Sequence, residues 1–134
     1  MYDWTVVLST HLSSGIYSLD TPAEEKAVQA VSERNGLDFT VIDLRAANGR
    51  ADLLAAFAGA LDFPAYFGGN WDALYDCLTD MSWRPARGYA LLLVGLQALS
   101  AGAGDELAPL AGLLRSVVDF RRRQGVPFYV VLSG

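Results

Sequence analysis

The chain has 134 residues, of which 52% are hydrophobic and 19% are charged, and this composition predicts one folded domain and excludes a disordered chain. Fifteen Asp and Glu against ten Lys and Arg give a net charge of −5, which opposes binding to nucleic-acid phosphates or anionic lipids and favours a basic partner. A single cysteine and a single histidine exclude an internal disulfide and a thiolate zinc cluster.

Residues 1–36 are predicted to form an N-terminal extension that packs on the same domain. The first residues carry no positive charge of the kind that opens a secretory signal, and the longest uncharged stretch is too short and broken to span a bilayer. We therefore expect a cytoplasmic protein that does not bind membranes.

Within this extension, residues 4–8 and 16–19 are apolar and β-branched and are predicted as strands. A helix follows, with Thr21 as its cap, Pro22 in its first turn and Glu24 as the capping-box partner. Asn35 and Gly36 are expected to end that helix.

Strands and helices alternate in residues 37–134. Strands are predicted at residues 39–44, 89–94 and 127–132, helices at residues 50–61, 71–81 and 106–123, and a loop at residues 64–70. Gly125 is expected to end the last helix. Alternating elements favour parallel pairing, so the predicted fold class is α/β: a small, mainly parallel sheet of three or four strands packed with helices.

The predicted helix 71–81 carries an aspartate at every fourth position, Asp72, Asp76 and Asp80, which we call the acid ridge. At about 100° per residue the three carboxylates lie within an arc of roughly 80°, and the leucines of this helix face the opposite side. No Lys or Arg lies between Arg50 and Arg84 to compensate them. A solvated helix face is the common explanation of such a stripe, but the aromatic, glycine-rich loop before it favours an interface.

Other interpretations of the same segment are weaker. Gly68 and Gly69 could cradle a phosphate, but Asp72 would repel it, so we expect a tight turn with Asn70 as helix cap. Hydrolysis by Asp72 and Asp76, or Mg²⁺ held through water by the acid ridge, has no supporting motif. We predict no cofactor and no metal site.

Two further features are expected to be structural. The basic run at residues 121–123 lies at a helix end, where positive charge complements the helix dipole, and the net charge opposes a nucleic-acid patch. Cys77 is expected to fill space in or near the core.

The segment FPAYFGGNWDALYDCL, residues 63–78, resembles the signature of the barstar family, intracellular protein inhibitors of barnase-type ribonucleases. The strand, long helix and terminal strand that follow fit the same family, so the likeness covers residues 37–133 and divides the chain into the extension 1–36 and a barstar-like domain 37–134. It implies a barstar-like fold.

The resemblance also implies a binding site. In this family the equivalent helix and loop enter the ribonuclease active site, where aspartates take the place of RNA phosphates and meet the catalytic basic groups. By motif match, Asp76 is expected to be the central plug, the aspartate that fills the middle of the ribonuclease active site, and Asp72 is expected to bind beside it. The full set of expected partner-binding residues is Asp72, Asp76, Tyr66, Phe67, Gly68, Asn70, Trp71, Tyr75, Thr79 and Asp80.

Three positions depart from the family pattern. Tyr75 stands where the family usually has Trp, Gly69 where an acidic residue is common, and Phe120, beside Asp119, where the last helix supplies an acidic contact. These changes lie around the acidic plug rather than in it, so they bear on which ribonuclease is bound.

The predicted function is therefore inhibition of a basic ribonuclease or ribonuclease toxin domain, protecting the producing bacterium as an immunity protein or antitoxin. The free protein is expected to be a monomer and not an enzyme. The alternatives are a barstar-like scaffold repurposed as a regulatory interaction module and, less favoured, a carboxylate- and Mg²⁺-dependent hydrolase.

Overall fold

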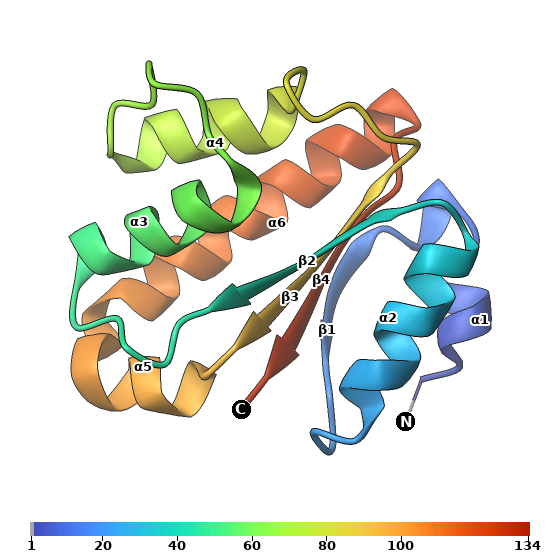
Figure 1. The fold of residues 1–134 in the computed structure, drawn as a ribbon, viewed down its shortest axis with the longest axis horizontal. Coiled ribbons are helices and arrows are strands. Elements are labelled where there is room, and N and C mark those ends of the chain that lie inside the picture. The colour runs from blue at the N-terminus through green and yellow to red at the C-terminus, as the bar shows by residue number, and fades with distance from the viewer. Residues whose placement is uncertain (1) are drawn as a thin grey trace.

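A single parallel sheet organises the molecule. The computed structural model describes residues 2–134 and contains strands β1 (Gly15–Ser18), β2 (Asp38–Asp43), β3 (Tyr89–Val94) and β4 (Phe128–Ser133). Their order across the sheet is β1-β4-β3-β2 and every pair is parallel. The predicted α/β class with a small parallel sheet is confirmed, and the sheet within residues 2–134 has four strands. Figure 1 shows the strands side by side with their arrowheads pointing the same way.

Helices cover both faces of the sheet. On one side lie α3 (Arg50–Leu61), α4 (Trp71–Asp80), α5 (Leu96–Ala103) and α6 (Leu107–Gln124), and on the other lie α1 (Trp4–Val7) and α2 (Glu24–Arg34) (Figure 1). The chain crosses from β1 to the far edge at β2 and then returns through β3 to β4. Because parallel crossovers are right-handed, connections that run in opposite directions across the sheet place their helices on opposite faces.

Two hydrophobic clusters fill the space between these layers. Alternate residues of each strand enter different clusters, as in β3, where Leu91 and Leu93 face α3, α4 and α6 while Ala90 and Leu92 face α1 and α2. A strand buried on both faces has a continuous apolar sequence, as residues 89–94 do. The sheet is therefore the shared wall of two cores.

The first predicted strand is wrong, because residues 4–7 form helix α1. Asp3 caps this helix, accepting a hydrogen bond from the Thr5 N–H at 3.1 Å. Trp4 and Leu8, one turn apart, are buried against the second cluster, whereas Val6 is 61% exposed. That spacing of four is helical, and it decides the conformation over the β propensity of the run.

The start of α2 also differs from the expected capping box. The helix begins at Glu24, after a turn, and no Thr21 side-chain cap forms. The Glu24 carboxylate nonetheless reaches back to accept hydrogen bonds from the N–H groups of Asp20 and Thr21, at 3.0 and 3.2 Å. The acidic half of the motif is present without the threonine half.

Hydrogen bonds join the N-terminal segment to the sheet. The Ser14 hydroxyl accepts a bond from the Phe128 N–H at 3.0 Å, and the buried Tyr129 hydroxyl donates to the Thr10 carbonyl at 2.5 Å. The pairing of β1 with β4 adds to these contacts, so residues 2–36 pack against the sheet.

The remaining elements lie within one or two residues of their predicted bounds, except that helix α5 and the short 3-10 helices His11–Ser13 and Gly104–Glu106 were not predicted. Close packing requires a glycine at position 88, before β3, because an added Cβ would lie 2.7 Å from the Pro127 Cβ and 2.8 Å from the Pro127 carbonyl oxygen. Among residues 2–134 no helix has the length and apolar character needed to cross a membrane.

Truncation of Leu8 should destabilise the whole domain. Leu8→Ala leaves a cavity under α1 and is expected to lower the free energy of unfolding by about 2–4 kcal/mol in a single denaturation transition. Val6→Ala, on the exposed side of the same helix, should change it by less than about 0.5 kcal/mol. If Leu8→Ala leaves the main denaturation transition unchanged, the N-terminal layer folds separately from the rest of the protein.

Tyr129 should make stability depend on alkaline pH. Burial raises the pKa of Tyr129 to about 12, while an unfolded tyrosine ionises near 10. From pH about 10 to 12 the unfolded chain therefore loses a proton that the folded chain keeps, so the free energy of unfolding falls as pH rises through this window. Urea unfolding at pH about 9 and 11 should show a smaller fall for Tyr129→Phe than for the parent; an equal fall would contradict the assignment.

Candidate functional site

The loop 62–70 and helix α4 form one continuous surface. Asn70 caps α4, its side-chain oxygen accepting a hydrogen bond from the Ala73 N–H at 2.7 Å. Gly69 before it has a φ of +69°, in the left-handed region that glycine adopts without strain. The predicted tight turn with an Asn70 cap is confirmed.

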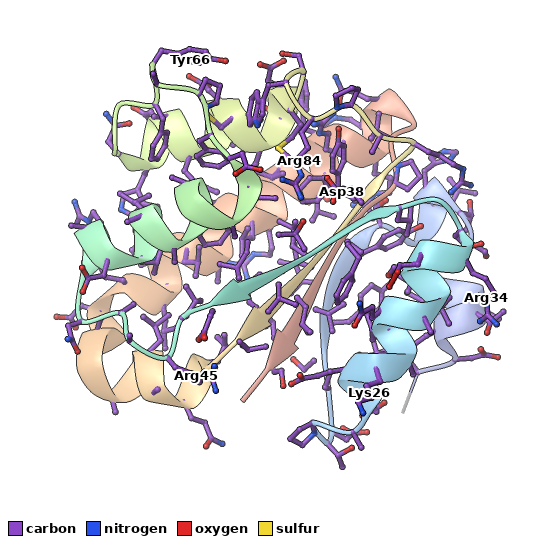
Figure 2. The ribbon with its side chains drawn as sticks, viewed as in Figure 1. Lys26, Arg34, Asp38, Arg45, Tyr66 and Arg84 are labelled. Atoms are coloured by element: carbon purple, nitrogen blue, oxygen red, sulfur yellow. The ribbon has the colours of Figure 1, made fainter. Side chains whose placement is uncertain are left out.

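Aromatic packing holds the loop against the body of the domain. The Phe63 ring contacts Phe67 at 4.9 Å and Trp83 at 5.7 Å between centroids. The Trp83 indole N–H donates to the Leu61 carbonyl at 3.0 Å. Tyr66 lies between these anchors in sequence but projects outward, 72% exposed, at the edge of the molecule (Figure 2). The packing of Phe63 and Phe67 against the domain thus holds the loop in a conformation that exposes Tyr66.

The acid ridge is open to solvent along the whole helix. Asp72, Asp76 and Asp80 are all exposed, and within residues 2–134 none of their carboxylates forms an ion pair. The Asp80 carboxylate accepts one hydrogen bond, from the Ser82 hydroxyl at 3.1 Å. This differs from Asp62, whose carboxylate lies 2.9 Å from the Arg84 guanidinium. The three carboxylates of α4 are therefore available to a partner.

The uncompensated negative charge of the acid ridge affects the pKa of a neighbouring group. Burial, followed by the negative charges of Asp80 and Asp76, raises the pKa of the Cys77 thiol on the inner side of the helix. Like charges one turn apart destabilise an isolated helix by a few tenths of a kcal/mol per pair. Tertiary packing must therefore hold α4 in place, and it does so through Leu74, Leu78 and Met81, which are fully buried.

The flank of α4 facing α6 is aromatic. Tyr75 is half-buried, and its ring lies 6.5 Å from the Phe120 ring of α6 between centroids, at an interplanar angle of 62°. The Thr79 hydroxyl donates to the Tyr75 carbonyl at 2.8 Å, so its hydrogen is used within the helix. Phe120 therefore contributes an apolar surface beside the acid ridge.

Arg121 has a structural role that its place in the sequence did not predict. It is buried, and its guanidinium donates to the carbonyls of Leu78 and Asp80 of α4, at 3.1 and 3.3 Å. Desolvation lowers its pKa, and the rings of Tyr89 and Phe128 lie beneath it. Arg121 thus caps the end of α4. The available signal was its position on the apolar stripe of α6, one turn beyond Val117 and Val118.

The residues predicted for the site are brought together, since all belong to this loop and helix. Their exposure separates them: Tyr66, Gly68, Asn70, Asp72, Asp76 and Asp80 are exposed, while Phe67, Trp71, Tyr75 and Thr79 are half-buried. Over residues 2–134 no three or more His, Cys, Asp or Glu side chains gather closely enough to hold a metal ion.

The fold and the site define a parallel α/β protein that presents an acidic helix on its surface. The chain matches the family described as Barstar (barnase inhibitor) over residues 37–133, and it belongs to this family. The matched region contains β2, β3, β4 and the whole of α4, and α1, β1 and α2 lie outside it. A search of curated proteins found no match.

The Asn70 cap should contribute measurably to stability. Asn70→Ala leaves the Ala73 N–H without its acceptor and is expected to lower the free energy of unfolding by about 1 kcal/mol. Asn70→Ser supplies another capping oxygen and should retain most of this free energy. Chemical denaturation of the three proteins checks this; equal losses in both variants would show that the cap is not the cause.

Proposed function

We propose that this protein inhibits a basic ribonuclease by placing the acid ridge and the loop before it in the enzyme's active site. The observation that carries the proposal is the exposure of Asp72 and Asp76, which have no ion pair within residues 2–134, on a helix whose other face is buried. Membership of the barstar family supports the same function.

The charge arrangement suits a cleft that binds RNA. An enzyme that cleaves RNA holds the phosphate with cationic side chains, and carboxylates can meet these groups in charge-assisted hydrogen bonds. Asp76 lies midway along α4, with Asp72 one turn before it, and both can enter one cleft. Tyr66 of the preceding loop and Tyr75 of the same helix supply aromatic surface, as interface centres commonly do.

The surroundings of the acid ridge determine which enzyme fits. Gly69 in the loop and Phe120 on α6 are uncharged, and the Phe120 ring contacts Tyr75. We propose that the partner presents cationic groups to Asp72 and Asp76 and an apolar side chain to Tyr75 and Phe120. A divergent ribonuclease, or a toxin domain of ribonuclease type, would keep the cationic groups of its active site and could differ in the residues around them.

Substitution of the central aspartate should abolish tight inhibition. The parent protein is expected to inhibit a barnase-type ribonuclease at one equivalent, and Asp76→Ala should bind at least about 30-fold more weakly, since truncation of a hot-spot residue costs about 2 kcal/mol or more. Asp72→Ala should act in the same direction. The readout is titration of ribonuclease activity with each variant.

Glu33→Ala is the matched control, because it removes one exposed carboxylate from α2 on the opposite side of the sheet. Alanine has a high helix propensity and relieves like-charge repulsion, so Asp76→Ala cannot act by unfolding α4. The association rate should also fall as salt concentration rises. Equal inhibition by all variants would overturn the proposal, and no inhibition of any ribonuclease tested would favour a repurposed interaction module.

A further inference from the structure

A second candidate site lies between α6 and the edge strand β1, away from the acid ridge. A groove of about 560 Å³ opens here, a volume within the range of about 300–1,000 Å³ that small-molecule sites occupy. None of its lining residues belongs to α4 or to the loop before it. Figure 1 shows α6 running along the sheet on the side of α3 and α4.

One continuous face of α6 forms a wall of the groove. Its lining residues recur at helical spacing from Leu107 to Arg122, a stretch of about 22 Å at 1.5 Å per residue. The opposite wall comes from Gly15 and Ile16 of β1 and from Leu132 of β4. Ile16 and Leu132 are only partly buried, so this part of the sheet is incompletely covered.

The lining is aliphatic. Among residues 2–134 no aromatic ring lines the groove, and its apolar members are Ile16, Leu93, Leu96, Leu107, Leu110, Ala111, Leu114, Val118 and Leu132. Such a surface offers no stacking partner for a planar ring system. It fits a flexible hydrocarbon chain.

The rim of the groove is positive although the chain is acidic overall. Arg115 and Arg122 both line it, with Asp119 as the acidic neighbour. Arg122 is already engaged, in an ion pair with Asp119 and a 3.4 Å hydrogen bond to the Ser14 carbonyl. Within residues 2–134 the Arg115 guanidinium is exposed and has neither an ion pair nor a hydrogen bond.

We propose that this groove binds a free aliphatic carboxylate, with the hydrocarbon chain along the leucines of α6 and the carboxylate at Arg115. Charge complementarity selects an anionic head group, and the aliphatic lining selects the chain. Both α6 and β1 contribute to this site, so it exists only because the N-terminal segment adds a strand beyond β4.

The test is an NMR titration of the full chain, ¹⁵N-labelled, with dodecanoate below its micelle-forming concentration. Saturable shifts should be confined to amides that line the groove, and Arg115→Gln should weaken binding by about fivefold, as expected for loss of one charge-assisted contact. Arg123→Gln removes an exposed arginine that lies outside the groove on the same helix, and it should bind like the parent. Dodecyltrimethylammonium, with the same chain and the opposite charge, should bind more weakly.

A second variant tests the cavity itself. Ala111→Phe places a ring in the groove and should abolish binding, with circular dichroism confirming that the variant is folded. Arg115→Gln alters only an exposed side chain and remains informative if Ala111→Phe does not fold. The proposal is overturned if dodecanoate does not saturate, if the shifts map elsewhere, if the cationic detergent binds equally, or if sedimentation shows a dimer whose interface is this groove.

Discussion

Burial of the inner face of α4 is the constraint on which the proposed function depends. Leu74, Leu78 and Met81 are fully buried, and Arg121 donates to the last carbonyls of the helix. These contacts offset the mutual repulsion of three aspartates that would weaken the helix by itself. The domain thereby holds a concentrated negative charge in a fixed position, which is the condition for charge-assisted binding without a large entropic cost.

The sheet carries this arrangement, and the N-terminal segment completes the sheet. Residues 2–36 cover a face of the sheet that would otherwise expose Leu92, Val131 and the ring of Tyr129, and Trp4 is one of the side chains that cover it. They also add β1 beside β4, which creates the groove along α6. The segment before the matched residues 37–133 therefore provides part of the second hydrophobic cluster and part of the lining of the groove.

The sequence was most informative where local and tertiary preferences agree. Residues 50–61 form the predicted helix α3, because their leucines and Phe57 recur at helical spacing and all face the core. The prediction from sequence was wrong at residues 4–7, where a β-branched run is helical. The burial of Trp4 and Leu8, one turn apart, outweighs the β propensity of this run. Arg121 was missed because a charge at a helix end suggests solvent, and only packing shows that α4 carbonyls lie within its reach.

The sequence by itself determined the parallel α/β class, the acidic helix with its Asn70 cap, and the family, because periodicity, capping and motif are local properties of the chain. Tertiary structure alone decided the order β1-β4-β3-β2, the second layer and the solvent exposure of the acid ridge. It also decided that Arg84 pairs with Asp62, while within residues 2–134 no arginine pairs with Asp72 or Asp76. These facts depend on contacts between residues far apart in the chain, which local patterns do not encode.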